Sequence, residues 1–468
     1  MQKVFSLSLL LFISLFVFAQ TYVPSGVDTI TDYGNYHPQI EIANDNNPIL
    51  LWTDQLTKSV FTAKYNGTDF NTPVQLNPVG LQVQSYNWSG ADLAIWGDNV
   101  YVVFRSHGYE TGHVYLVKSI DNGNTFGDTI RVDHLATGFG QYPDVAVFND
   151  TVFVTFMDHN SSGLNPQYVV SRSLDGGATF QSEVVAGEII GDEACDCCQP
   201  EIVVNEQSVI LFFRNNNTSI RDIKATVSYD RGATFTSWFS VDDHQWYLNS
   251  CPSTGPDAMG TEDNRVLTSY RTYENNVATV FLNEYDITQN LSLTLKQISS
   301  GISPNPNYPQ IAYQNGNLGM VWEGLGQSVD VFFIASNTGI SGLDTVNTLN
   351  LTNTIGPQSK PDIVFDGSQF HIVYANGFNL EYLQVSELVS ISDSKPDNMN
   401  FGIFPNPSTG IIHFDGMLSR LEVYDIYGNL IGTFSNKTID ISGAASGIYF
   451  LKATDEQGRS WSRKLVKH

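Results

Sequence analysis

The chain has 468 residues, a formal net charge of −25 and only 15% charged residues. A surface this acidic repels phosphate backbones, so the composition argues against nucleic acid as a partner. Tyr, Phe, Gly and Asn are plentiful, which suits β-strands joined by turns better than helices. The length allows one large β domain and a second, smaller one.

Residues 1–19 have the pattern of an export signal peptide. A lysine precedes a nearly apolar run at residues 5–18, and Val17 and Ala19 occupy the −3 and −1 positions of a small-residue cleavage site. The run is too short for a comfortable membrane span, and the sequence contains no other stretch suited to a spanning helix. We therefore predict an exported protein that is cleaved near Ala19.

A short anchor motif repeats through the next part of the chain, at steps of 53, 52, 57, 56, 53 and 52 residues. It consists of a small or polar residue, usually Pro, then Asp, Glu or Gln, then an apolar strand. The copies begin at Pro38, Ala91, Pro143, Pro200, Pro256, Pro309 and Pro361. A second strand ending on an aromatic residue and two further strands follow each anchor. Four short antiparallel strands at this period predict an all-β fold, a seven-bladed β-propeller over residues 20–385.

The last unit contains only three strands, of which the third spans about residues 380–385. The N-terminal strand at residues 27–31 precedes the first unit just as each fourth strand precedes the next unit. We predict that it completes the seventh blade and closes the ring.

Three units contain Ser-x-Asp-x-Gly-x-Thr-Phe between their third and fourth strands, with the aspartates Asp121, Asp175 and Asp230. The aspartate can accept N–H bonds within the turn, and the glycine permits a positive φ. The motif resembles the Asp-box, or BNR repeat, of sialidases and related propellers. Because this element occurs in hydrolases, lyases and binding proteins alike, the resemblance implies a fold and leaves the chemistry open.

Residues 386–400 are polar and predict a linker. The following segment, 401–468, begins with Phe401-Gly-Ile-Phe-Pro-Asn-Pro-Ser-Thr-Gly410 and ends with basic residues. It resembles the C-terminal sorting domain of type IX secretion (Por system) substrates, a small immunoglobulin-like β-sandwich. The resemblance implies a Bacteroidetes bacterium, passage through the type IX machinery, and release or anchoring at the outer-membrane cell surface. An ordinary adhesive β-sandwich is the alternative.

In each blade the first strand starts, and the second strand ends, at the same end of the propeller, which we call the top face. The residue after the second-strand aromatic is Arg105, Arg214, Arg271 or Glu323 in four of the blades. Arginines are suited to bidentate carboxylate binding. Sialidases use an arginine triad and a Tyr–Glu pair, so the resemblance implies that these arginines bind a substrate carboxylate and that Glu323 acts with Tyr270.

Two features weaken this assignment. The Arg-Ile-Pro motif of the first sialidase blade is replaced by Tyr-His-Pro-Gln at residues 36–39, and no tyrosine stands out as the nucleophile. The alternative is structural pairing of the arginines with the acids at the strand entries, Asp92, Asp144, Glu201 and Asp257.

All four cysteines, Cys195, Cys197, Cys198 and Cys251, precede the first strands of blades four and five on the top face. In an exported protein an even cysteine count favours disulfides, here two bridges with one of them from Cys251. The alternative is a copper or zinc site that includes a nearby histidine such as His244.

Aromatic residues of the top loops, Trp246 among them, can stack on sugar rings or can pack between blades. The prediction is a secreted or cell-surface, sialidase-like propeller that binds or hydrolyses acidic glycans at its top face. A copper- or zinc-binding propeller and a non-catalytic interaction propeller with a disulfide-linked rim are the alternatives.

Overall fold

The computed structural model describes residues 22–31, 36–108, 110–159, 166–189, 192–261, 263–387, 402–415, 420–425, 429–434, 437–454 and 460–468. Contacts divide the chain after Leu388 into two compact units. The expected signal peptide and residues 388–400 of the expected linker lie outside the described residues. Within the described part of the chain, no helix is long and apolar enough to span a membrane.

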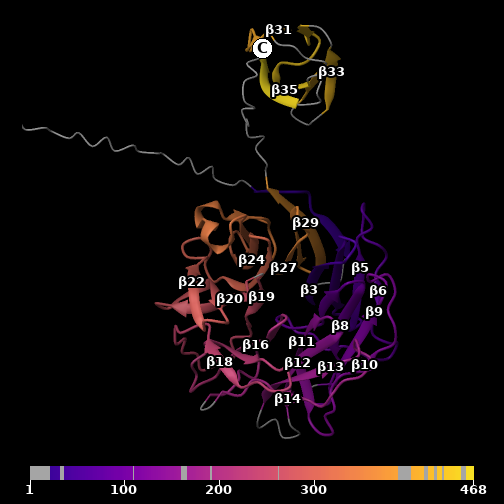
Figure 1. The fold of residues 1–468 in the computed structure, drawn as a ribbon, viewed down its shortest axis with the longest axis vertical. Helices are drawn as coiled ribbons and strands as arrows, with labels where there is room; N and C mark the ends of the chain where they lie inside the picture. The colour runs from indigo at the N-terminus through magenta and orange to yellow at the C-terminus, as the bar shows by residue number, and fades with distance from the viewer. Residues whose placement is uncertain are drawn as a thin grey trace, which may run out of the picture. The chain divides into compact units, whose positions relative to one another are not determined.

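The larger unit consists of seven antiparallel sheets, six of which are each built from four strands consecutive in the chain. The strands of blades one to three are β3 (Tyr36–Ile42), β4 (Pro48–Asp54), β5 (Ser59–Lys64), β6 (Val74–Gln75); β7 (Asp92–Trp96), β8 (Asn99–Arg105), β9 (Val114–Ser119), β10 (Ile130–Arg131); and β11 (Phe139–Phe148), β12 (Thr151–His159), β13 (Gln167–Ser173), β14 (Val184–Val185). In Figure 1 the first strands lie toward the middle of the unit and the fourth strands lie at its rim.

The other blades follow the same order. Their strands are β15 (Glu201–Val204), β16 (Val209–Arg214), β17 (Ile223–Ser228), β18 (Ser237–Ser240); β19 (Asp257–Gly260), β20 (Arg265–Glu274), β21 (Val277–Asp286), β22 (Leu291–Gln297); β23 (Asn307–Gln314), β24 (Asn317–Leu325), β25 (Val329–Ser336), β26 (Leu349–Asn350); and β27 (Gln358–Phe365), β28 (Gln369–Asn376), β29 (Asn379–Glu387). Two short 3-10 helices, η1 (Gly339–Gly342) and η2 (Thr345–Asn347), precede β26. The predicted seven-bladed β-propeller is confirmed.

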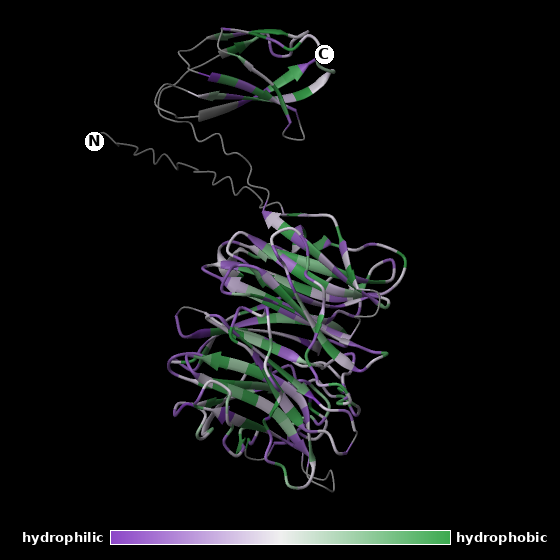
Figure 2. Ribbon diagram, turned by 90° about the vertical axis from the view of Figure 1, so that its right-hand side faces the viewer, coloured by the Kyte–Doolittle hydropathy of each residue, from purple (hydrophilic) through white to green (hydrophobic). Residues whose placement is uncertain are grey.

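The hydrophobic core lies between neighbouring blades. Every residue of β16 is buried, because this strand is flanked by β15 and β17 and covered on both faces. One buried cluster joins Phe212 of blade four to Tyr270 and Phe281 of blade five. Figure 2 shows the corresponding hydrophobic colour along the strands and more hydrophilic colour in the loops.

The ring closes as the sequence predicts. The N-terminal strand β2 (Asp28–Thr31) pairs antiparallel with β29, with Asp28 opposite Tyr382. A further strand, β1 (Tyr22–Pro24), pairs with the end of β29, where Tyr22 lies opposite Glu387. Strand β29 therefore continues two residues into the segment expected as a linker.

The three repeated turns share one hydrogen-bond pattern. In each, the aspartate accepts the backbone N–H of the threonine four residues later at 2.8–2.9 Å and its hydroxyl at 2.6–2.7 Å. Hydrogen bonds from the Ser and Thr side chains of the turn hold the pKa of Asp121, Asp175 and Asp230 at about 2. The turn glycines have φ between +74° and +89°, as the motif requires.

Replacing one turn aspartate is expected to cost a modest amount of stability. Asp175→Ala removes the acceptor of both Thr179 hydrogen bonds, and because the turn is exposed we expect a loss of about 1 kcal/mol in the free energy of unfolding. Urea unfolding measures it. Asp128→Ala, at an exposed aspartate outside the turn, is the control and should change stability by less than about 0.5 kcal/mol. Equal effects of the two variants would contradict the structural role.

The smaller unit is a β-sandwich of two sheets. Strands β30 (Gly402–Phe404), β31 (Ile411–Asp415) and β34 (Thr438–Asp440) form one sheet, and β32 (Arg420–Tyr424), β33 (Leu430–Phe434), β35 (Gly447–Thr454) and β36 (Ser460–Lys467) form the other. Ile412, Val423 and Leu451 belong to a single buried cluster contributed by both sheets. The fold agrees with the small β-domain predicted for this segment.

Candidate functional site

The residue before each repeat anchor lies at the top of a first strand, near the propeller axis. These residues are His37, Gly90, Tyr142, Gln199, Gly255, Tyr308 and Lys360. In four blades the pairing of the first and second strands skips this residue and the following proline, which form a bulge. The four bulged residues, His37, Tyr142, Tyr308 and Lys360, have φ between +45° and +54°. This conformation costs a non-glycine residue about 1–3 kcal/mol and recurs at functional sites, so the bulges mark a candidate site.

Three of these bulges, those at His37, Tyr308 and Lys360, border a hollow of about 500 Å³ at the top of the axis, which we call the central pocket. Its wall includes His37, Gln199, Tyr308 and Lys360, together with Asn87 and Trp88 from the loop before β7. Six of the blades thus contribute to a single concave surface lined by amides, aromatic rings, one imidazole, one ammonium group and the carboxyl group of Glu201.

Two glycines of the ring leave space for their large neighbours. A Cβ on Gly90 would lie 2.7 Å from the Cβ of His37, and one on Gly255 would collide with the carbonyl oxygen of Gln199. Small residues at blades two and five therefore allow His37 and Gln199 to approach the axis.

His37 is fixed in the pocket as a neutral imidazole. The Gln39 amide donates to Nδ1 at 3.1 Å, so Nε2 is the protonated nitrogen and donates to Oε1 of Gln199 at 2.8 Å. Burial lowers the pKa of His37 to about 4. The side chain can therefore exchange hydrogen bonds with a ligand without changing charge near neutral pH.

Lys360 is the cationic group of the pocket wall. Its Nζ donates to Oδ1 of Asn87 at 3.1 Å and lies 5.2 Å from the ring centroid of Tyr36. Burial lowers the pKa of the Lys360 ammonium. Its backbone N–H donates to Oε2 of Glu323 at 3.1 Å, which links the pocket to the predicted catalytic glutamate.

Tyr308 lies close enough to Glu323 and Arg271 for their charges to shift the pKa of its hydroxyl. Burial and the Glu323 carboxylate raise the pKa of Tyr308, whereas Arg271 lowers it. Burial also raises the pKa of Glu323. Tyr308 is not among the site residues predicted from the sequence, although its place directly before the anchor proline could have identified it.

Arg105 and Arg214 are buried structural residues rather than the expected carboxylate ligands. Arg105 Nε donates to the carbonyl of Gly140 at 2.6 Å and Nη2 to that of Gly108 at 2.6 Å. Arg214 is fully buried and donates to the carbonyls of Thr254, Arg221 and Arg271 at 2.5–2.9 Å. Both guanidinium groups therefore hold loops of the top face in place.

Arg271, Trp246 and Tyr270 differ in their access to the pocket. Arg271 is partly exposed, and its Nη2 donates to Asn305 at 2.8 Å. Trp246 is only 7% exposed, because it stacks on Tyr273 with Arg214 over its ring. The Tyr270 side chain is buried in the core between blades four and five, where burial raises the pKa of its hydroxyl. Tyr270 is thus a core residue rather than the expected nucleophile, and Trp246 packs against protein.

The strand-entry acids bond backbone groups of the next blade instead of the arginines. Asp362 accepts the N–H of Ile40 at 2.7 Å, Asp144 that of Ile202 at 2.6 Å, and Asp257 that of Ile311 at 2.6 Å. These contacts join blades seven to one, three to four and five to six. The proposed pairing of arginines with these acids is therefore not what the structure contains.

Below the central pocket, the same acids line a channel along the axis with an open volume of about 1050 Å³. Glu41, Asp92, Asp144, Glu201, Asp257 and Asp362 contribute carboxyl groups to it. Burial raises the pKa of all six, to about 8 for Glu41 and about 7 for Asp362.

The cysteines form one bridge rather than the two expected. Cys197 and Cys251 are joined, whereas Cys195 and Cys198 are buried thiols. Three of the sulfurs, those of Cys195, Cys197 and Cys198, lie within 4.8 Å of one another. His244, the histidine expected beside them in a metal site, does not belong to this group. Its Nδ1 lies 2.5 Å from Oδ1 of Asp242 instead. The bridge occupies two of the four sulfurs that the copper or zinc hypothesis requires.

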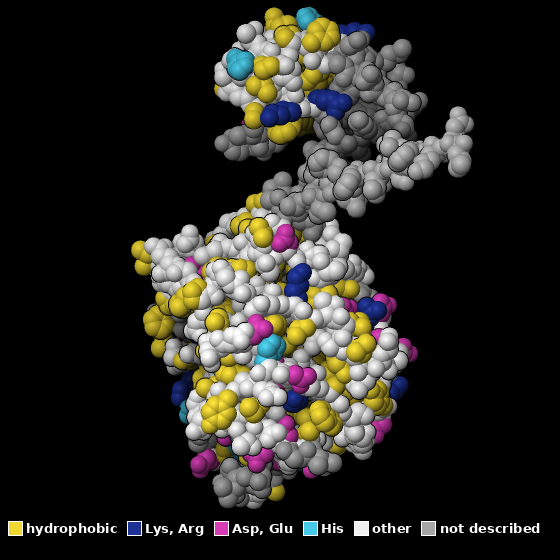
Figure 3. Space-filling view, turned by 90° about the vertical axis from the view of Figure 1, so that its left-hand side faces the viewer, with side chains coloured by type: hydrophobic (Ala, Val, Ile, Leu, Met, Phe, Trp, Pro, Cys, Tyr) yellow, Lys and Arg dark blue, Asp and Glu magenta, His cyan; other side chains and the backbone are white. Residues whose placement is uncertain are grey.

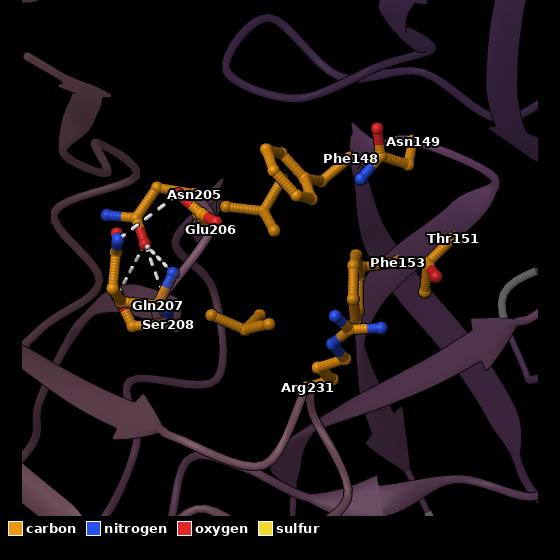
Figure 4. Close-up of a pocket in the computed structure, with 11 residues that line it drawn as sticks. Phe148, Asn149, Thr151, Phe153, Asn205, Glu206, Gln207, Ser208 and Arg231 are labelled. Atoms are coloured by element: carbon orange, nitrogen blue, oxygen red, sulfur yellow. Dashed lines mark hydrogen bonds between the residues drawn. The ribbon is translucent and has the colours of Figure 1, made fainter. Parts of the chain in front are cut away.

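A second hollow, of about 380 Å³, lies at the opposite end of the propeller between blades three and four. Figure 4 shows Phe148 and Phe153 facing the turn at residues 205–208, with Arg231 at one side. Asn205 accepts hydrogen bonds from Gln207 and Ser208 within that turn. The polar groups of this second hollow are therefore used in hydrogen bonds within the turn. For this reason the central pocket is the better candidate site. On the face of the larger unit shown in Figure 3, basic and acidic side chains are interspersed rather than separated by sign.

Comparison with known proteins identifies the smaller unit. Residues 402–468 match the family described as the secretion system C-terminal sorting domain. Such a domain implies secretion by the type IX machinery and attachment at the cell surface or outer membrane. No curated protein sequence matches the chain.

The larger unit is similar to solved propellers of sialidases and polysaccharide lyases. An ulvan lyase of polysaccharide lyase family PL25 aligns with a TM-score of 0.54 and 10% identity, over 77% of this chain and 95% of that one. The polysaccharide lyase Uly1 aligns with a TM-score of 0.50 and 11% identity, over 78% and 99%. The NanB sialidase of Streptococcus pneumoniae gives a TM-score of 0.42 and 9% identity, over 79% and 70%. At such identities the two lyase alignments show a likeness of fold alone.

Proposed function

We propose that this protein is a secreted or cell-surface propeller that binds acidic glycans in its central pocket. The observation that supports this most is the Lys360 ammonium among aromatic rings and side-chain amides at the top of the axis. Amides bond sugar hydroxyls, rings stack on sugar faces, and an ammonium group attracts a carboxylate. The sorting domain, which implies secretion and attachment at the cell surface or outer membrane, supports a ligand outside the cell.

The finer expectations about export belong to the same proposal. They are cleavage near Ala19, a propeller that ends near residue 385, a linker at 386–400 and a Bacteroidetes source. N-terminal sequencing of the exported protein tests the first, since a mature chain that begins at Gln20 is the expected result.

Hydrolysis is a second candidate, favoured by the position of Tyr308 near Glu323 and Arg271. Tyrosine hydroxyls that pass their proton to a carboxylate act as nucleophiles in covalent catalysis, and Tyr308 lines the central pocket. Release of sialic acid from a synthetic sialoside tests this directly. Activity that disappears in Tyr308→Phe while glycan binding persists would support hydrolysis, and binding without any product would leave a binding protein.

Removing the pocket cation is expected to weaken the binding of acidic glycans selectively. Lys360→Gln keeps an N–H donor, on a side chain one atom shorter, and removes the charge, so we expect about a ten- to hundredfold loss of affinity for uronate- or sialate-containing oligosaccharides. Affinity for neutral oligosaccharides should change little. Isothermal titration calorimetry on the full chain measures both.

Lys58→Gln is the matched control, because Lys58 is another lysine with a positive φ and its Nζ lies 3.0 Å from Nε2 of His107, outside the pocket wall. Its affinity should equal that of the unmodified protein. Acidic and neutral glycans that bind equally well, or an unchanged affinity in Lys360→Gln, would contradict the proposal.

A further inference from the structure

One buried thiol lies next to both a disulfide and a second thiol. Cys195 Sγ is 3.4 Å from the Sγ of Cys197, which is bridged to Cys251, and 3.4 Å from the Sγ of Cys198. The Tyr168 hydroxyl donates to the carbonyl of Cys198 at 2.6 Å and lies 3.3 Å from that of Cys195. This buried tyrosine therefore helps to hold the backbone that places the three sulfurs together.

The surroundings of Cys195 favour its thiolate. Nη1 of Arg221, a buried arginine, donates to Cys195 Sγ at 3.3 Å. The hydrogen bond from Cys198 and the charge of Arg221 lower the pKa of Cys195 to about 7, even though burial acts in the opposite direction. Burial raises the pKa of Cys198. A low-pKa thiol beside a higher-pKa one is the arrangement in which the first attacks and the second resolves.

The bridge beside this thiol is open to solvent on one side. Cys251 is exposed and Cys197 is partly exposed, whereas Cys195 and Cys198 are buried. The Sγ of Cys251 also lies 3.0 Å from the hydroxyl of Ser253, a group that can donate to a departing thiolate. The two pairs thus differ in access, with one facing the surface and the other shielded beneath it.

We propose that the four cysteines form a single thiol–disulfide exchange site, in which the buried Cys195 and Cys198 pair can pass its two electrons to the surface Cys197–Cys251 bridge. The Cys195 thiolate attacks Cys197, the 195–197 bond forms, and Cys251 leaves as a thiolate that takes a proton from solvent. The Cys198 thiol then loses its proton and attacks Cys195, and Cys197 leaves. The site ends with a 195–198 disulfide and thiols at 197 and 251.

No external oxidant or reductant takes part in this exchange, since one disulfide and two thiols are present before and after it. External thiols or disulfides of small size can then reach the site through Cys251. The 197–251 bridge joins the loop before β15 to the loop before β19. When the bridge opens, these two neighbouring loops of the top face lose their covalent link.

Two single variants that each retain three cysteines test the exchange without any reductant. Each is produced in an oxidising compartment as the full chain, labelled with iodoacetamide in the native state, quenched with acid and mapped by mass spectrometry. In Cys198→Ser the attacking thiol is present, so Cys251 should be released and labelled. In Cys195→Ser only the resolving thiol remains, and labelling of Cys251 should be at least tenfold lower.

Equal labelling of Cys251 in the two variants would overturn the proposal. The unmodified protein supplies a second test, in case a variant fails to fold. When it is equilibrated in glutathione buffers and quenched with acid, the species with one bridge should contain both the 195–198 and the 197–251 pairings. A species that contains only 197–251, or four thiols that hold stoichiometric copper or zinc and do not exchange, would also overturn it.

Discussion

Arg214→Ala is expected to destabilise the propeller by about 3–5 kcal/mol, the largest effect of any single change considered for this protein. The guanidinium group is fully buried, donates to three backbone carbonyls and packs over Trp246. Its removal leaves those carbonyls without their donor and opens a cavity, and each buried unsatisfied group costs about 1–3 kcal/mol. Chemical unfolding of the full chain, followed by tryptophan fluorescence, measures the loss.

Arg231→Gln provides the control, because this arginine is exposed in the turn of blade four. Its effect should stay within about 0.5 kcal/mol. An Arg214→Ala protein that keeps its stability but no longer binds acidic glycans would return Arg214 to the ligand-binding role predicted from the sequence.

Glu41→Gln is expected to stabilise the propeller, and to do so by about 1–2 kcal/mol more at pH 8.5 than at pH 6.5. Burial and the neighbouring Asp362 and Asp92 raise the pKa of Glu41 to about 8. A carboxyl group whose pKa is higher in the folded than in the unfolded state weakens folding progressively as the pH rises from the unfolded pKa to the folded one, and the loss is complete above the folded pKa. At pH 6.5 the folded protein keeps Glu41 protonated, whereas at pH 8.5 it must ionise the group inside the channel. The channel is open to solvent, which keeps the effect below that of a closed core.

The difference between the variant and the unmodified protein at the two pH values isolates Glu41 from the other ionisable groups of the chain. Thermal unfolding measures the melting temperature of Glu41→Gln relative to that of the unmodified protein. This difference should be roughly 2–4 °C larger at pH 8.5 than at pH 6.5. Glu188→Gln, at an exposed position, should show no such dependence. A variant that is less stable at pH 8.5 would show that the ionised carboxylate contributes a favourable contact.

The repeat was enough to predict the fold. A constant spacing, an anchor before each apolar strand and one strand displaced to the N-terminus define seven four-stranded blades and their closure, because each unit can bury its faces only against its neighbours. The turns around Asp121, Asp175 and Asp230 were equally predictable, since their hydrogen bonds are local. The sorting domain was recognisable because several of its motifs occur in order.

The candidate site was less predictable, because it depends on which way side chains turn in the loops. Arg105 and Arg214 occupy equivalent positions in their blades, but carbonyl groups of nearby loops take their N–H donors, which a sequence pattern cannot indicate. Tyr308 and Lys360 reach the pocket because the residue and the proline that follows form a bulge with positive φ. The repeat places Tyr308 and Lys360 at equivalent positions, directly before the anchor proline. The repeat itself does not indicate that this position forms a bulge facing the pocket.

The most direct test of the central claim is a crystal structure of the protein with an acidic oligosaccharide bound. The account predicts the sugar carboxylate about 3 Å from Nζ of Lys360, with a sugar ring against Trp88 or Tyr308 in the central pocket. A carboxylate held elsewhere on the propeller, with the central pocket empty, would contradict it.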